Sequence, residues 1–107
     1  MEKLRIVIVE PDKPPYEREI DHTLESLQGI VEGNIETTWD EGLPEGTLIV
    51  CNEEGKLLNL PQNRVRWIGS CPVDVIYGTF FVVGTEDEDF ISLTDEQVSV
   101  CLECFQE

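Results

Sequence analysis

The run over residues 4–9, Leu-Arg-Ile-Val-Ile-Val, constrains the fold more than any other part of the sequence. Apart from Arg5 it is apolar and mostly β-branched, a pattern typical of a central strand that is covered on both faces. Pro11, Pro14 and Pro15 follow and predict an extended loop, because proline fixes φ and has no N–H to donate. Further strands are expected over residues 35–39, 47–51, 56–60, 73–77 and 79–83, with residues 62–72 irregular.

A first helix is predicted over residues 16–31. Its apolar residues recur at spacings of four, four, three and four, which would place them on one face of a helix. They are Tyr16, Ile20, Leu24, Leu27 and Val31. Gly33 and Asn34 would end this helix.

A second helix is predicted at the end of the chain. Thr94 and Gln97 have the spacing of a capping box, and Asp95 and Glu96 fall where the helix dipole favours negative charge. The apolar face of this helix would comprise Val98, Cys101, Leu102 and Phe105.

Length and composition predict one domain over residues 1–107. Hydrophobic residues make up 40% of the chain and none is alanine, so larger side chains carry the apolar content and can bury more area. The expected fold is α+β, a single mixed sheet of about five to six strands with two helices packed on it. No stretch approaches the roughly 18 apolar residues of a membrane span. The N-terminus lacks the pattern of a signal peptide, so a cytoplasmic protein is expected.

Negative charge dominates the composition, with 23 Asp and Glu against 7 Lys and Arg and a net charge of −16. A field of this sign repels nucleic acid and anionic membranes and attracts basic surfaces. The positive charges are confined to residues 3–18 and 56–66. Direct binding of nucleic acid or membrane is therefore disfavoured, and a basic protein is the expected partner.

Two acidic segments are candidates for binding such a partner. On the predicted first helix, Glu17, Asp21 and Glu25 repeat every four residues and would form a stripe of carboxylates about 6 Å apart. That distance is close to the spacing of phosphates along a nucleic-acid strand. The second segment is the unbroken acidic run Glu86, Asp87, Glu88 and Asp89. The alternative interpretation is a solvated face without a partner.

The basic residues offer a different site. If residues 56–66 fold back near the proline-rich loop, several cations would line an anion pocket. With neighbouring polar residues, this candidate ligand site comprises Lys13, Tyr16, Arg18, Asn52, Lys56, Asn63 and Arg64. The alternative is a set of local salt bridges to the surrounding acids.

No catalytic, cofactor or metal site is predicted. Cys101 and Cys104 have the spacing of a redox pair, but they fall in the last turns of a predicted helix, where the dipole disfavours a thiolate. Zinc needs four ligands, and His22, the single histidine, is far from them in sequence. No glycine-rich phosphate loop precedes a helix. Together with Cys51 and Cys71, these cysteines are expected to be free thiols.

Several segments together resemble a known family. They are residues 9–16 (Val-Glu-Pro-Asp-Lys-Pro-Pro-Tyr), 51–57 (Cys-Asn-Glu-Glu-Gly-Lys-Leu), 60–64 (Leu-Pro-Gln-Asn-Arg), 78–84 (Gly-Thr-Phe-Phe-Val-Val-Gly) and 92–97 (Ser-Leu-Thr-Asp-Glu-Gln). Over nearly its whole length the chain resembles a family of small proteins of phages and mobile elements of gut bacteria, known as a domain of unknown function, number 3846. The resemblance brings no catalytic residues. It implies shared function around residues 52–64 and 11–16, and gene neighbourhoods rich in anti-defence proteins.

These observations favour a non-enzymatic binding protein. The leading hypothesis is a phage or mobile-element protein that binds and inhibits a basic host defence protein, such as a CRISPR effector or restriction nuclease, as a DNA mimic in the host cytoplasm. The second hypothesis is a small-molecule binder that sequesters a nucleotide signal through the basic residues. An interaction module for another mobile-element protein is a further alternative, and a homodimer is left open.

Overall fold

The computed structural model of the chain describes residues 2–106. In chain order its elements are β1 (Lys3–Val9), β2 (Tyr16–Asp21), α1 (Leu24–Val31), β3 (Ile35–Thr38), β4 (Thr47–Asn52), β5 (Gln62–Ile68), β6 (Cys71–Tyr77), β7 (Phe80–Glu86), β8 (Asp89–Ile91) and α2 (Asp95–Cys104). Neither helix of this described part is long and apolar enough to cross a membrane.

Six strands form the main sheet, in the order β2-β1-β7-β4-β3 with β8 paired to β7. These pairings are antiparallel. Strands β5 and β6 form a separate two-stranded sheet. The predicted α+β class, with a sheet of five to six strands and two helices, is confirmed. Within residues 2–106 the sheet is antiparallel rather than mixed, and the sequence does not predict the second sheet.

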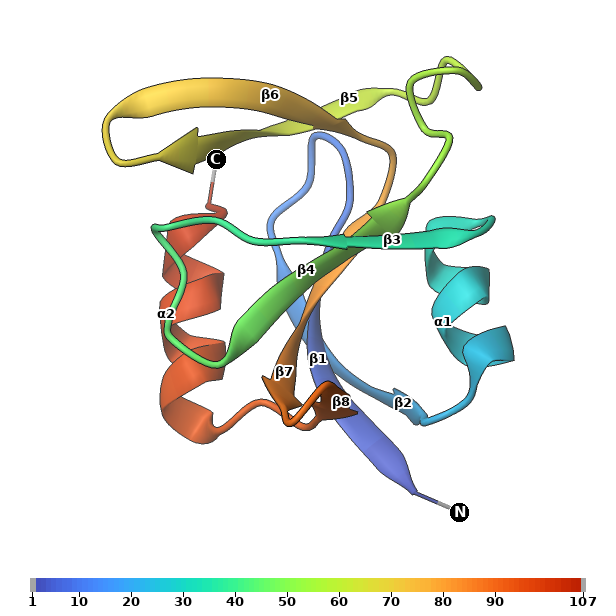
Figure 1. Ribbon diagram of the computed structural model, residues 1–107, viewed down its shortest axis with the longest axis vertical. Coiled ribbons are helices and arrows are strands. Elements are labelled where there is room, and N and C mark those ends of the chain that lie inside the picture. Colours follow the sequence, from blue (N-terminus) through green and yellow to red (C-terminus); the bar gives the residue numbers. More distant parts are fainter. Residues whose placement is uncertain (1, 107) are drawn as a thin grey trace.

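Strand β7 lies at the centre of the main sheet and is buried on both faces. Phe80 and Val82 belong to the core on the α2 side, and Phe81 and Val83 belong to the core on the α1 side. Figure 1 shows the two helices on opposite sides of the sheet. The neighbouring strand β1 also contributes side chains to both cores, which confirms the central, doubly covered strand predicted over residues 4–9.

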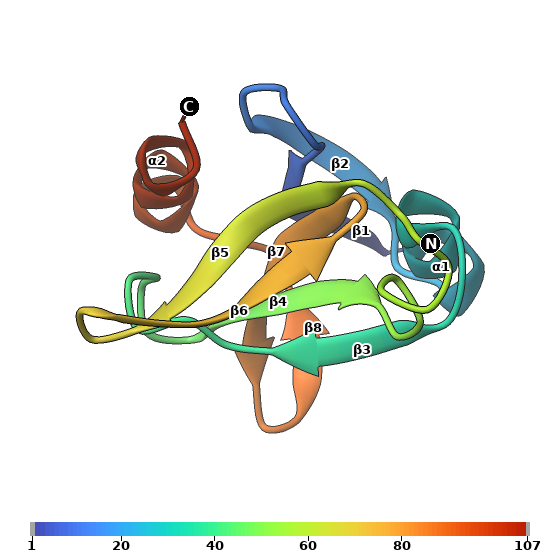
Figure 2. The same cartoon turned by 90° about the horizontal axis from the view of Figure 1, so that it is seen from above.

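Strands β5 and β6 form a hairpin that lies over one end of the main sheet (Figure 2). Asn63 anchors its base, because the side-chain amide donates to the carbonyls of Val9 at 2.9 Å and Gly78 at 2.8 Å. Farther out, the Arg66 guanidinium donates to the Asp74 carboxylate across the hairpin and to a carbonyl of the β3–β4 loop. The hairpin is thus attached to the rest of the fold both at its base and farther out.

This hairpin corrects the predictions for residues 56–72. Residues 56–60 form turns instead of a strand, with Asn59 at a φ of 56°. Residues 62–72, predicted to be irregular, contain β5 and the beginning of β6. Two register shifts interrupt the β5–β6 pairing. Because of them, the sequence of β5 does not show the regular period of two that identifies a strand.

The predicted helix over residues 16–31 is wrong in its first half. The first six residues form β2, which pairs with β1 along its length, and only Leu24–Val31 is helical. The spacing of four between Tyr16 and Ile20 fits a strand as well as a helix, since residues at even spacing share one face of a sheet. The helix begins where the hydroxyl of Thr23 caps its first turn.

The predicted C-terminal helix is confirmed. Thr94 and Gln97 form the expected capping box, in which each side chain accepts the backbone N–H of the other residue. The buried face of this end of the chain comprises Val98, Cys101 and Phe105, with Leu102 partly buried beside them.

Gly33 follows α1 for a reason other than the predicted one. The left-handed residue at the end of the helix is Glu32, with a φ of 61°. A Cβ on Gly33 would lie 2.7 Å from the side-chain nitrogen of Asn52. That buried amide donates to the Val31 carbonyl at 3.0 Å, and its oxygen accepts the backbone N–H of Glu54 at 2.7 Å. Asn52 therefore joins the end of α1 to the end of β4.

Alanine at the two glycines of this region should have opposite effects on stability. Gly29 lies inside α1, and a Cβ there would meet nothing within 4 Å. Gly29→Ala should raise the free energy of unfolding by up to about 1 kcal/mol through helix propensity. Gly33→Ala should lower it by about 1–3 kcal/mol, because it displaces the Asn52 amide from its partners. Urea unfolding of both variants measures the difference, and equal effects would contradict this role of Asn52.

Candidate functional site

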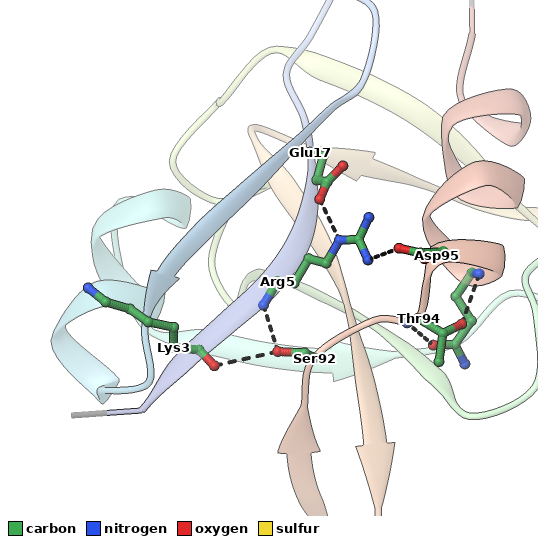
Figure 3. Close-up of polar contacts among 7 residues, drawn as sticks. Lys3, Arg5, Glu17, Ser92, Thr94 and Asp95 are labelled. Atoms are coloured by element: carbon green, nitrogen blue, oxygen red, sulfur yellow. Dashed lines mark hydrogen bonds and ion pairs between the residues drawn. The ribbon is translucent and has the colours of Figure 1, made fainter.

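Arg5 joins three elements on one side of the sheet (Figure 3). Its guanidinium lies between the carboxylates of Glu17 on β2 and Asp95 at the start of α2, and it donates to both. These two hydrogen bonds raise the pKa of Arg5. Lys3, also on β1, binds the Asp21 carboxylate of β2. Two of the basic residues are thus used to neutralise carboxylates of the neighbouring strand.

The predicted stripe of Glu17, Asp21 and Glu25 does not form, because the first two lie on a strand and the third lies on α1. Glu17 and Asp21 are paired with the cations of β1. Glu25 is exposed in the first turn of α1, where its charge interacts favourably with the helix dipole. A row of carboxylates with regular spacing is therefore absent from this part of the described chain.

The second acidic segment, residues 86–89, forms the tip of the β7–β8 hairpin. Glu86 pairs with Asp89 across the ladder, and Asp87 and Glu88 make the two-residue connection. Both connecting residues have positive φ, 49° and 71°, as a type I′ turn requires. Such turns favour Asn-Gly, because an ordinary side chain in the left-handed region costs roughly 1–2 kcal/mol. Four exposed carboxylates are therefore held at a strained turn. The sequence does not predict this turn, because Asp-Glu is not one of the dipeptides that favour it.

The residues of the candidate ligand site do not share one pocket. Tyr16 and Arg18 line a cleft of about 590 Å³ between β2 and α1. Asn52 and Lys56 line a hollow of about 260 Å³ between the end of β4 and the β5–β6 hairpin. Arg64 borders a third hollow, of about 340 Å³, beside the end of α2. The single anion pocket predicted from the two basic segments is thus not formed.

Three members of that set, Asn52, Asn63 and Arg64, hold the fold together. Arg64 does fold back onto the proline-rich loop, which was the condition for an anion pocket, but its guanidinium donates to the backbone carbonyls of Lys13 and Phe105, both at 2.8 Å. Asn63 and Asn52 are likewise engaged with backbone groups. Their polar atoms serve internal contacts, which explains why these residues do not gather around one ligand.

The four cysteines are free thiols, as predicted. Cys51 and Cys101 are buried, whereas Cys71 and Cys104 are exposed. Burial, with a further contribution from the Glu36 carboxylate, raises the pKa of Cys51 to about 11. Burial raises the pKa of Cys101 to about 12. The two buried thiols are thus protonated near neutral pH and poorly nucleophilic.

Alkylation should distinguish the exposed Cys71, at the start of β6, from the buried cysteines. At pH 8, a thiol with a pKa of about 11 is in the reactive thiolate form in roughly one molecule in a thousand. Iodoacetamide should modify Cys71 first and Cys51 and Cys101 slowly, with rates that increase as pH rises toward their pKa values. Peptide mass spectrometry after timed quenching measures this order. Modification of Cys51 as fast as Cys71 would contradict its protection by burial.

Comparison with known proteins identifies a family. No curated protein and no solved structure matches the chain. One family model matches residues 4–106, which is nearly the whole chain, and it confirms the resemblance found in the sequence. The chain therefore belongs to the family described as Domain of unknown function (DUF3846).

Proposed function

We propose that this chain is a non-enzymatic acidic protein that binds and inhibits a basic host protein, one that itself binds nucleic acid. An origin in a phage or mobile element, which the family resemblance implies, favours a host defence protein such as a CRISPR effector or a restriction nuclease. Binding would take place in the host cytoplasm and would compete with the nucleic acid. The observation that carries the proposal is the distribution of charge over the folded chain.

Most of the positive charge is used within the fold. Lys3 and Arg5 bind carboxylates, Arg66 binds Asp74, and Arg64 binds backbone carbonyls. The surface formed by residues 2–106 therefore presents many more carboxylates than free cations, in a chain of net charge −16. A protein surface that normally binds phosphates offers the complementary potential.

The β7–β8 tip is the strongest local candidate for the contact. It exposes the predicted run Glu86, Asp87, Glu88 and Asp89, and residues 67–107 contain no Lys or Arg to offset it. Adjacent carboxylates repel one another and the turn is strained, so this sequence opposes folding locally. A basic partner would relieve this repulsion, and the relief would add to the affinity of the complex. Glu17 and Asp21 contribute less, because their charges are already paired.

A favoured turn at the tip should stabilise the chain and weaken the complex. Asp87→Asn combined with Glu88→Gly supplies the preferred type I′ dipeptide and removes two charges. The free energy of unfolding should rise by about 1 kcal/mol. Affinity for a CRISPR effector or a restriction nuclease, measured by biolayer interferometry at low salt, should fall about tenfold.

The matched control is Glu53→Gln combined with Glu54→Gln. This control removes the same amount of charge at a site far from the tip. The start of β4 lies near the tip, because Thr47 pairs with Gly84, whereas Glu53 and Glu54 follow the other end of β4. The control should change the affinity little. Duplex DNA and added NaCl should both displace the wild-type chain from its partner. Binding that is insensitive to salt, or that the control weakens as much as the tip variant does, would refute the proposal.

A second candidate is a small-molecule binder that uses the cleft between β2 and α1. Arg18 favours it, because this arginine has no ion-pair partner among the described residues in spite of the excess of acids. Tyr16, Ser26 and Thr79 border the same cleft. In a thermal-shift assay with a nucleotide panel, one ligand should raise the melting temperature of the wild type and leave that of Arg18→Ala unchanged. No response to the whole panel would remove this candidate.

A further inference from the structure

The β5–β6 hairpin exposes several large apolar side chains close together in sequence. They are Val65, Trp67, Ile68 and Val73. Trp67 is 43% exposed, although the indole is large enough to fill a core position. Apolar side chains that gather on one protruding element mark an interaction surface more often than single exposed ones do. The hairpin is therefore a candidate for binding, in addition to the acidic tip.

A groove of about 340 Å³ separates this hairpin from the C-terminal end of α2. Val65 and Trp67 line it from the hairpin, and Cys104 and Phe105 line it from the end of α2. Leu43 of the β3–β4 loop completes the apolar lining. Figure 1 shows the end of α2 below the hairpin. The three segments that line the groove are distant from one another in sequence.

The groove is held open by hydrogen bonds on both sides. One carboxylate oxygen of Asp40 accepts the backbone N–H of Trp67 at 2.8 Å, and the other accepts that of Gly42 at 2.8 Å. On the opposite side, Arg64 of the hairpin donates to the Phe105 carbonyl at the end of α2. Because the walls are already fixed to one another, binding of a partner does not have to order them, and little of the binding free energy is lost in doing so.

Carboxylates lie at the edge of the groove. Asp40 lines it, and an oxygen of Glu41 lies 3.6 Å from the position that a Cβ on Gly69 would take, at the turn of the hairpin. Burial makes the largest contribution to raising the pKa of Cys104, and the carboxylates of Asp40 and Glu103 raise it further. Arg64 also lines the groove, but its guanidinium is bound to backbone carbonyls. Its one positive charge is set against the carboxylates of Asp40, Glu41 and Glu103, so the groove combines an apolar lining with a net negative rim.

We infer that the groove binds an apolar side chain of a partner segment whose flanking residues are lysine or arginine. The lining accepts the apolar anchor, and the surrounding carboxylates attract the flanking cations. A symmetric contact with a second copy of this chain is unfavourable, because it would bring the Asp40 and Glu41 carboxylates of the two copies together. This inference rests on the proposed function, because it takes the partner to be a basic protein. It adds an apolar contact that would fix the position of that partner on the chain.

Titration of the ¹⁵N-labelled chain with two synthetic peptides tests this inference. One peptide has a central leucine between lysines, and the other has glycine in place of the leucine. Trp67 and Trp39 give separate indole N–H signals, and the leucine peptide should shift the signal of Trp67 and leave that of Trp39. Trp67→Ala should weaken the binding about tenfold, as removal of an aromatic side chain from the centre of an interface does.

Trp39→Ala is the matched control, because Trp39 is 49% exposed but does not line the groove. It should leave the affinity for the leucine peptide unchanged. Equal binding of the glycine peptide, or equal weakening by Trp39→Ala, would overturn the inference. So would a dimer in sedimentation equilibrium that Trp67→Ala dissociates, because a second copy would then occupy the groove.

The result also separates this inference from the proposed function. If the leucine peptide fails to bind while a nuclease still binds in a salt-sensitive way, the groove is refuted and the proposed function stands. If the peptide binds at Trp67 while the tip variant leaves nuclease binding unchanged, the groove stands and the acidic tip is refuted.

Discussion

The burial of β7 is the constraint on which the rest of the structure depends. Its side chains Phe80, Phe81, Val82 and Val83 are buried on alternate faces, and full burial of an apolar side chain contributes roughly 1.5–3 kcal/mol. This burial must offset the chain entropy and also the mutual repulsion of a net charge of −16. Neither face of the central strands can remain in water, and α1 and α2 therefore pack on opposite sides of the sheet.

The few basic residues are placed where elements distant in sequence meet. Arg5 connects β1 with β2 and α2, Arg64 connects β5 with the proline-rich loop and the end of α2, and Arg66 connects β5 with β6 and the β3–β4 loop. Cations used in this way offset little of the charge elsewhere. The negative surface over residues 2–106 therefore follows from the composition together with the internal use of the cations, and it does not need an acidic helix.

Prediction from sequence succeeds here where a local sequence pattern is compatible with only one type of secondary structure. The apolar run at residues 4–9 and the capping box at Thr94 are patterns of that kind. The spacing of four that begins at Tyr16 fits helix and strand equally, and the pairing of β2 with β1, which decides between them, is not local. The groove beside Trp67 needs three distant segments to meet, so no local pattern contains it. The acidic tip was predicted as a charged segment, but its turn was not, because Asp-Glu is not a favoured turn dipeptide.

The central claim is that unneutralised carboxylates dominate the electrostatics of the folded chain and leave a repulsion that a basic partner relieves. The dependence of the melting temperature on NaCl tests it most directly. Raising NaCl from about 0.01 M to about 0.1 M shortens the Debye length from about 30 Å to about 10 Å and screens repulsions and ion pairs alike. If repulsion dominates, the melting temperature rises over this range. A melting temperature that falls or stays constant would mean that the ion pairs of Arg5, Lys3 and Arg66 balance the excess charge, and it would contradict the claim.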